Sequence, residues 1–446
     1  MKRVKYISIL VIIIFITSFS KVAFAESIVS DGSIAPPEIH ADSAVLLDVD
    51  SNKILYEKNY KNKMYPASTT KLMTALVTLD KCSDLSEMVK ISYYAVHKVP
   101  YSYSIANLYP GEEFSVKDLL YALMIPSAND AAYVLAEYIA NGGNNYEIDS
   151  SNSTKEAFEK SQATFADMMN EKAKELGCEN THFVNPNGIH DDDHYSTAYD
   201  LLLMGKQAYA NSTIRTIAKT TEYTLDNTSI YTGASRVLKT TNLLLLKSRS
   251  GYYEYANGLK TGYTEAAQSC IIASSQKNDR NLIAVVLHSD TTDNSNAPTR
   301  EDDCKSLFEY GFNNFSNSTL IKKDDVADTI TISNATNETK SLNALCQNEV
   351  KALTVNGEDT NFTPTIEITK TKAPIAQGEV IGKVTYNVRG ENFSSDLIAE
   401  HDVIAVDYTP YILAGGIAFI VLIFVIIIIK KIKNRKRRRT YKHNRY

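Results

Sequence analysis

The segment that decides the fold reads Tyr65-Pro66-Ala67-Ser68-Thr69-Thr70-Lys71-Leu72-Met73-Thr74-Ala75. Pro66 favours entry into a helix, and the apolar residues that follow Lys71 supply the face that such a helix would bury. Ser68 and Lys71 are three positions apart and therefore share one face of the helix. A serine hydroxyl needs a base to become a nucleophile, and a lysine can be that base only where burial or other cations lower its pKa. The segment therefore predicts a nucleophile beside its base, at a helix N-terminus whose positive field favours an oxyanion.

The S-x-x-K spacing is weak evidence when it stands alone. It also occurs at Ser18 and Ser274. The simpler interpretation of any single copy is a helix N-cap serine beside a solvated lysine. Further motifs in a fixed order are needed to favour catalysis.

The two ends of the chain predict export and anchoring. Residues 1–25 combine basic residues, an apolar run and the small residues of a cleavage site, which is typical of a secretory signal peptide. Residues 411–429 carry no charge and are long enough to cross a bilayer. Residues 430–446 are strongly basic, and the positive-inside rule places such a tail in the cytoplasm. The sequence therefore predicts a single-pass protein of the cell membrane whose body lies outside the membrane.

The charge of the chain is unevenly distributed. The formal net charge is −5, yet four Lys and Arg fall within residues 1–25 and ten within residues 410–446, with no acidic residue in either segment. The part between them holds 33 basic and 52 acidic residues, a net charge of −19. Such an acidic body argues against nucleic acid as a partner. The five cysteines match no zinc-ligand spacing and no dense disulfide framework.

The middle of the chain predicts one large domain of mixed α and β structure. Strands are expected in a hairpin over residues 43–59 and again near the end of the domain, with helices between these two groups of strands. Both ends of the domain therefore contribute to one antiparallel sheet covered by helices. The expected helices follow Ser68 and cover residues 116–125, 130–140, 158–176, 197–210 and 300–310, and the later strands cover residues 258–263, 270–275 and 282–287. Beyond residue 319 only strand patterns remain, at residues 329–332, 352–355, 365–369 and 380–386, which predicts a small β domain.

Two further motifs follow Ser68 and Lys71 along the chain. Ser127-Ala128-Asn129 lies at a break between two expected helices, where a hydroxyl can relay a proton and an amide can orient a substrate. Lys260-Thr261-Gly262 opens an expected edge strand, where a cation and a hydroxyl can bind a carboxylate and the glycine lets a substrate lie against the strand. Each motif alone has a simpler explanation, which is helix capping for the first and an exposed strand lysine for the second. All three together, in order and in an exported chain, favour catalysis.

With these motifs the chain resembles the serine-type D-Ala-D-Ala carboxypeptidases, the low-molecular-mass penicillin-binding proteins of peptidase family S11. The resemblance spans about residues 35–405, and its motifs are residues 66–75, 127–132, 183–188 and 259–264. It implies a β-lactamase/DD-peptidase-like antiparallel sheet flanked by helices with a helical subdomain, then a small β-sandwich-like domain and one C-terminal transmembrane helix. The expected order is signal peptide 1–25, catalytic domain 35–315, β domain 319–405, transmembrane helix 411–429 and cytoplasmic tail 430–446.

The resemblance also implies the role of each motif residue. Ser68 is the expected nucleophile and Lys71 its general base. Ser127 is the expected proton relay, and the substrate contacts are Asn129, Lys260, Thr261 and Gly262. The oxyanion would be held by the backbone N–H groups of Ser68 and Tyr263.

The activity that the resemblance implies is removal of the terminal D-alanine from peptidoglycan stem peptides, by a mechanism that needs no metal and no organic cofactor. β-Lactams are expected to act as covalent inhibitors, and the C-terminal anchor suggests a Gram-positive envelope. A DD-endopeptidase or a β-lactamase would share the fold, although no local feature supplies a dedicated deacylating glutamate. A non-catalytic wall-binding protein is a third alternative, which the intact set of motif residues disfavours.

Overall fold

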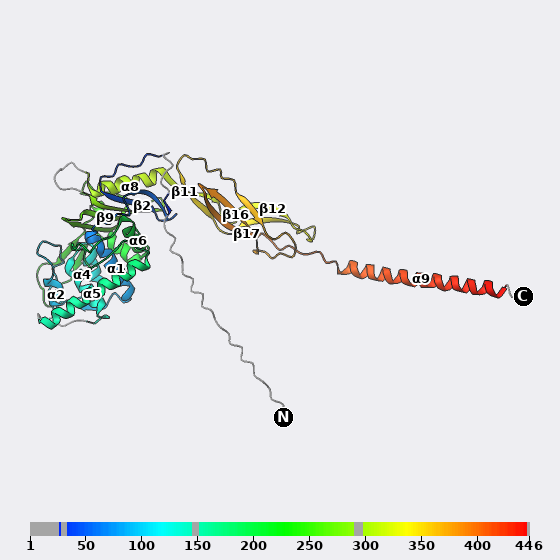
Figure 1. Ribbon diagram of the computed structural model, residues 1–446, viewed down its shortest axis with the longest axis horizontal. Helices are drawn as coiled ribbons and strands as arrows, with labels where there is room; N and C mark the ends of the chain where they lie inside the picture. Colours follow the sequence, from blue (N-terminus) through cyan, green and yellow to red (C-terminus); the bar gives the residue numbers. More distant parts are fainter. Residues whose placement is uncertain (1–25, 28–33, 145–150, 290–297, 444–446) are drawn as a thin grey trace, which may run out of the picture. The chain divides into compact units, whose positions relative to one another are not determined.

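The computed structural model describes residues 26–27, 34–144, 151–289 and 298–443 (Figure 1). The predicted signal peptide, residues 1–25, lies outside the described residues. The chain divides into two compact units, residues 1–315 and 316–446, and each is described by itself.

Unit 1 is built around a six-stranded sheet whose spatial order is β1-β3-β2-β10-β9-β8. All neighbouring strands are antiparallel except β1 and β3. Strands from both ends of the unit meet where β2 pairs with β10, which confirms the predicted sheet, and β8 forms one of its edges. The strands are β1 (Glu26–Ser27), β2 (Ser43–Asp48), β3 (Lys53–Lys58), β8 (Ala256–Thr264), β9 (Gln268–Lys277) and β10 (Arg280–Ser289).

Helices cover both faces of this sheet, with α8 on one face and α6 and α1 on the other (Figure 1). Two glycines mark how closely the helices approach. A Cβ on Gly311 of α8 would lie 2.7 Å from Leu282, and a Cβ on Gly205 of α6 would lie 2.9 Å from Ile272. Because both faces are covered, β9 and β10 are buried over most of their length, and their central apolar runs, residues 270–273 and 282–287, do not alternate with polar residues.

The remaining helices of unit 1 form a helical region beside the sheet. The predicted helices are confirmed, whereas the short helices α2 and α7 and the 3-10 turn η2 were not predicted. The helices are η1 (Ala67–Thr70), α1 (Lys71–Lys81), α2 (Tyr93–His97), α3 (Val116–Met124), α4 (Asn129–Ala140), α5 (Asn152–Glu175), α6 (Ala198–Ala210), α7 (Ser212–Lys219), η2 (Leu243–Leu245) and α8 (Arg300–Asn314). Two small two-stranded antiparallel sheets complete it, β4 (Met88–Lys90) with β5 (Glu113–Ser115) and β6 (Glu222–Leu225) with β7 (Arg236–Lys239).

Unit 2 contains a β domain and one long helix. A five-stranded sheet has the order β12-β13-β17-β16-β15, and β11 pairs with β14 in a second, two-stranded sheet. The strands are β11 (Phe315–Ile321), β12 (Val326–Thr331), β13 (Ser341–Cys346), β14 (Val350–Val355), β15 (Thr365–Ile368), β16 (Val380–Val388) and β17 (Glu391–Ala399). The four predicted strands are confirmed, whereas β11, β13 and β17 were not predicted. Helix α9 (Thr409–His443) includes a segment, Thr409–Lys436, that is long and apolar enough to cross a membrane.

Candidate active site

The predicted nucleophile lies on a short 3-10 turn, η1, which continues directly into α1. Ala67 in that turn has a left-handed backbone with a φ of 47°. Gly188 lies against it, and a Cβ on Gly188 would come within 1.9 Å of the Ala67 carbonyl oxygen. Gly188 itself has a φ of 77°, which is a second reason for a glycine there. The Ser68 turn is therefore supported by a loop more than a hundred residues later in the chain.

Lys71 is completely buried and has three polar neighbours. Its Nζ lies 2.9 Å from Ser68 Oγ, 2.9 Å from Asn129 Oδ1 and 2.6 Å from the carbonyl oxygen of Asn187. The last two atoms can only accept hydrogen bonds. A neutral amine would use both of its N–H bonds on these acceptors, and its lone pair would then be available to the Ser68 hydroxyl.

Electrostatics favour that neutral form of Lys71. Burial, and after it the positive charge of Lys260, lowers the pKa of Lys71 well below its usual value. Lys260 is 1% exposed, and burial followed by the charge of Arg300 lowers its pKa to about 7. The site therefore gathers three basic groups and lowers the pKa of its two lysines.

One wall of the site, here called the helical wall, consists of Ser127, the N-terminus of α4 and the loop of residues 102–112. Ser127 has a φ of 64°, which is costly for a residue with a side chain, and its buried Oγ has no hydrogen-bond partner among the described residues. Asn129 donates from both its backbone N–H and its Nδ2 to the carbonyl oxygen of Ser104. A strained serine whose hydroxyl has no partner among the described residues is consistent with a hydroxyl that forms its hydrogen bond with a bound substrate.

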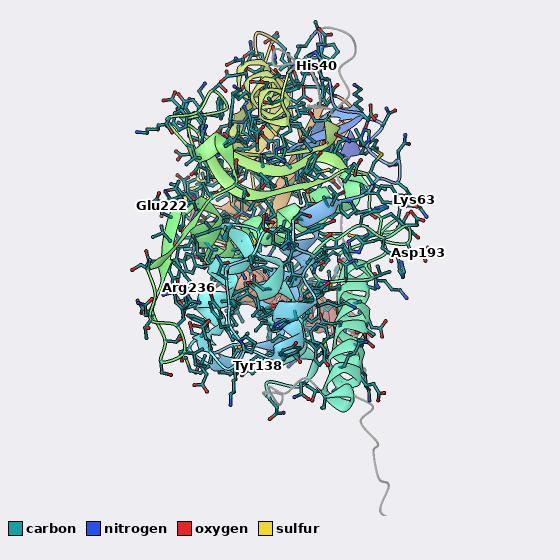
Figure 2. All side chains as sticks on the ribbon, turned by 90° about the vertical axis from the view of Figure 1, so that its left-hand side faces the viewer. His40, Lys63, Tyr138, Asp193, Glu222 and Arg236 are labelled. Atoms are coloured by element: carbon teal, nitrogen blue, oxygen red, sulfur yellow. The ribbon has the colours of Figure 1, made fainter. Side chains whose placement is uncertain are left out.

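The loop of the helical wall is held by charged side chains that are buried. Asp130 accepts hydrogen bonds from the backbone N–H groups of Ala106 and Leu108. Glu112 and Arg236 form a buried ion pair at 2.8 Å. Burial acts to raise the pKa of Glu112, but hydrogen bonds from Arg236 and Thr228 outweigh it and hold that pKa below its usual value. In Figure 2, Arg236 lies on the same side of unit 1 as Glu222 of β6, and Lys63 and Asp193 lie on the opposite side.

The opposite wall, here called the sheet wall, is the edge strand β8. Lys260 Nζ donates to the carbonyl oxygen of Thr261 at 2.9 Å, so the lysine lies beneath the strand rather than in solvent. Thr261 Oγ1 lies 2.6 Å from Thr241 Oγ1. A Cβ on Gly262 would lie 2.8 Å from the backbone nitrogen of Ser68, so this glycine allows β8 to reach the nucleophile turn. Tyr263, which follows, is 54% exposed.

The two walls enclose a cleft of about 530 Å³. Most of the predicted site residues line it, and Lys71 and Lys260 lie beneath its surface. Arg300 also lines it and donates from Nη1 to the carbonyl oxygen of Gly262 at 2.8 Å. The lining residues are Ser68, Ser102, Tyr103, Ser104, Ser127, Asn129, Thr241, Thr261, Gly262, Tyr263, Thr264, Glu265 and Arg300.

Known proteins match the chain over both units. Residues 31–159 and 147–291 match the family model of the D-alanyl-D-alanine carboxypeptidases (Peptidase_S11), and residues 315–405 match that of the penicillin-binding protein 5 C-terminal domain. The D-alanyl-D-alanine carboxypeptidase DacF of Bacillus subtilis is 31% identical over 407 residues, which cover 90% of this chain and 94% of that protein. The chain belongs to the D-alanyl-D-alanine carboxypeptidase family.

Solved structures agree with this assignment. Penicillin-binding protein 5 from Haemophilus influenzae aligns with 83% of this carboxypeptidase and 99% of its own chain, at 26% identity and a TM-score of 0.60. The Streptomyces K15 DD-transpeptidase aligns with 63% of this chain and 100% of its own, at 35% identity and a TM-score of 0.53. The predicted family, fold class and enzyme class are therefore confirmed. The protein is a serine-type D-Ala-D-Ala carboxypeptidase, a penicillin-binding protein of cell-wall peptidoglycan, and the roles of its individual site residues stay predictions.

Several groups that shape the carboxypeptidase site were not assigned a role from the sequence. The Asn187 carbonyl and Gly188 belong to a motif that was noticed but given no function. Arg300 and Thr241 reach the cleft from segments outside the three motifs. A backbone carbonyl has no sequence signature, so only the folded chain could identify the first of these.

Proposed function

We propose that this carboxypeptidase removes the terminal D-alanine from peptidoglycan stem peptides through an acyl-enzyme on Ser68. The observation that carries the proposal is the position of Lys71, 2.9 Å from Ser68 Oγ and completely buried, with two acceptors on its other side. This is the arrangement that a lysine needs to accept a proton from a serine.

Acylation begins when Lys71 accepts the Ser68 proton as Oγ attacks the carbonyl carbon of the penultimate D-alanine. The carbonyl oxygen becomes an oxyanion that the backbone N–H groups of Ser68 and Tyr263 stabilise. The close approach of Gly262 to the Ser68 nitrogen supports this pairing, because it brings the two donors to the same end of the cleft.

The tetrahedral intermediate collapses when the peptide C–N bond breaks and the departing nitrogen takes a proton. Ser127 relays that proton from Lys71, which its unpaired hydroxyl in the cleft supports. The carboxylate of the leaving D-alanine binds near Thr261 and Arg300, and the positive charge of the buried Lys260 adds to the attraction. Asn129 orients the amide of the substrate.

Water then hydrolyses the ester, with the proton transfers reversed, and the shortened peptide leaves. A β-lactam acylates Ser68 in the same way, but its leaving group stays attached and obstructs the water. The protein would therefore be inhibited by penicillin through a long-lived ester.

We also propose that the chain is exported and anchored by its C-terminal helix. The segment Thr409–Lys436 supports anchoring by its length and composition, and the basic residues after Ile429 support a cytoplasmic C-terminus. Under this proposal the predicted signal peptide is removed, and the β domain lies between the catalytic domain and the membrane anchor in the order of the chain. The enzyme acts outside the membrane during cell-wall remodelling.

A second candidate is transfer of the acyl group to an amine instead of water. It is favoured by the similarity of this chain to the Streptomyces K15 DD-transpeptidase. Supplying an amino-acid acceptor distinguishes the two, because transfer yields a new peptide while hydrolysis yields the free acid. The endopeptidase and β-lactamase alternatives are tested by a cross-linked peptide dimer and by penicillin turnover.

The base role of Lys71 is tested by Lys71→Ala in the full chain. We expect acylation by penicillin and D-alanine release to fall by about 10³-fold or more, since both need the Ser68 proton removed. Lys81→Ala at the exposed end of the same helix is the matched control and should keep the wild-type rate. Wild-type acylation in Lys71→Ala would refute the assignment.

A further inference from the structure

The cleft carries a positive charge near one part of β8 and a negative charge near the end of that strand. Arg300 is the one cation among the described residues that line it, and Glu265 is the one carboxylate. Glu265 follows directly after the end of β8, is exposed, and its carboxylate forms no hydrogen bond or ion pair with any residue that the structure describes. The mechanism proposed above gives this carboxylate no task.

The edge position of β8 determines how a peptide can lie in the cleft. An extended peptide can add to the free edge of such a strand, as peptides do in many recognition sites. Thr261 and Gly262, to whose carbonyl oxygen Arg300 donates, come before the proposed oxyanion donor Tyr263 along the strand, and Glu265 comes after it. A peptide with its C-terminus at Thr261 therefore runs antiparallel to β8, and its acyl-donor part extends toward Glu265.

Strand geometry gives the reach of this interaction. Glu265 is two residues beyond Tyr263 and is the first residue of the turn that follows β8, so it lies at most about 7 Å further along the chain direction. The attacked carbonyl carbon belongs to the penultimate D-alanine. The Cα of the residue that precedes this D-alanine would be about 5 Å from that carbon, because successive Cα atoms are about 3.8 Å apart. A four-carbon side chain on that residue is long enough to bring its terminal group to the Glu265 carboxylate. The group that pairs best with an exposed carboxylate is a primary ammonium.

We propose that Glu265 recognises a free ammonium group on the side chain of the residue that precedes the two D-alanines. This inference rests on the function proposed above and adds a preference among its substrates. When that amine has been acylated, as it is in a peptide cross-link, its charge is lost and the contact disappears. The enzyme would thus favour peptides whose side-chain amine is still free, and it would act before the reaction that acylates this amine.

The size of the preference follows from the exposure of Glu265. An ion pair at a solvated site is weak, so we expect a ratio of about 2- to 5-fold in kcat/KM rather than an absolute selection. The ratio should shrink as the salt concentration rises, because exposed charges are screened.

The test compares two peptides that differ in one charge. Nα-acetyl-L-Lys-D-Ala-D-Ala has a free side-chain amine, and the Nα,Nε-diacetyl peptide does not. D-Alanine release is measured with the full chain in detergent for the wild type, Glu265→Gln and Glu265→Lys. We expect the wild type to favour the free amine, Glu265→Gln to treat both peptides alike, and Glu265→Lys to favour the diacetyl peptide. Glu113→Gln removes an exposed carboxylate that does not line the cleft, and it should keep the wild-type ratio.

Two outcomes would overturn the inference while leaving the proposed function intact. Equal use of both peptides by the wild type is the first. The second is a penicilloyl ester that lives much longer in Glu265→Gln than in the wild type, since that would assign Glu265 to deacylation. Failure to release D-alanine from either peptide would instead overturn the proposed function, and this inference with it.

Discussion

The two walls of the cleft are built in different ways. The sheet wall is the edge strand β8, fixed by the ladder that β8 forms with β9, regular from Gly258 to Thr264, and by helices on both faces of the sheet. The helical wall is held by a few polar contacts between segments far apart in the chain, such as Glu112 with Arg236. It also contains Ser127 in a strained conformation. The comparison suggests that the sheet wall supplies rigidity and the helical wall supplies the group that must interact with the moving proton.

Among changes to the two walls themselves, the largest effect should come from breaking the junction between the sheet wall and the nucleophile. In Gly262→Ala the new Cβ would lie 2.8 Å from the Ser68 nitrogen and 3.0 Å from the Thr69 nitrogen. We expect kcat/KM to fall by about 10²- to 10³-fold, the usual cost of a lost oxyanion donor, while the fold persists. Steady-state D-alanine release and circular dichroism measure both quantities.

Tyr263→Phe is the control for this prediction. The proposed oxyanion donor at this position is a backbone N–H, so removal of the phenolic hydroxyl should change kcat/KM by no more than about 2-fold. A normal rate in Gly262→Ala would show that β8 need not approach Ser68 so closely.

A smaller loss of rate is expected on the helical wall, and there the loss should be accompanied by a gain in stability. Ser127→Gly removes the proposed proton relay and also relieves the left-handed strain. We expect D-alanine release to fall by about 10²-fold and the free energy of unfolding to rise by about 1 kcal/mol. Ser127→Ala, which keeps the strain, should lose the rate without gaining the stability.

Urea unfolding of the two variants measures the difference. Equal stability of Ser127→Gly and Ser127→Ala would mean that the backbone at this position is not strained. The description of the helical wall as strained would then be wrong.

The smallest effect concerns Lys260 under the sheet wall. Burial and then the charge of Arg300 lower its pKa to about 7, so the lysine loses its charge as the pH rises above 7. KM for a peptide carboxylate should then rise several-fold between pH 6 and pH 9. The effect of pH on stability has the opposite direction to its effect on substrate binding. The unfolded chain binds the proton more tightly between about pH 7 and its ordinary pKa, so the contribution of this group to stability increases with pH over that window.

Lys260→Met separates this effect from other titrations. Its KM should already be high at pH 6 and should lack the rise that the wild type shows. A wild-type KM that stays constant from pH 6 to pH 9 would contradict the depressed pKa of Lys260.

The same contrast explains what the sequence could predict. The apolar runs of β9 and β10 and the break between α3 and α4 are local patterns, and they predicted the sheet and the position of Ser127. The strand that carries Lys260 was also expected, but nothing local indicated that this lysine is buried.

The polar contacts between distant side chains of the helical wall could not be predicted from a single sequence. Glu112 and Arg236 are separated by 124 residues, and residues 83–115 were left without assigned elements because α2, β4 and β5 are too short to show a clear period. Two of the elements that were not predicted, α7 and β13, do have a recognisable sequence pattern. The period of Ile214, Ile217 and Ala218 marks α7, and the alternation within residues 341–346 marks β13.

The central claim is that Ser68 carries the acyl group. The most direct measurement is the intact mass of the full-length protein after reaction with penicillin, followed by peptide mapping, together with D-alanine release from the diacetyl-L-Lys-D-Ala-D-Ala peptide. The account predicts one penicilloyl group on Ser68 of the wild type, loss of D-alanine release in proportion to labelling, and neither labelling nor release in Ser68→Ala. Labelling or D-alanine release by Ser68→Ala would contradict it.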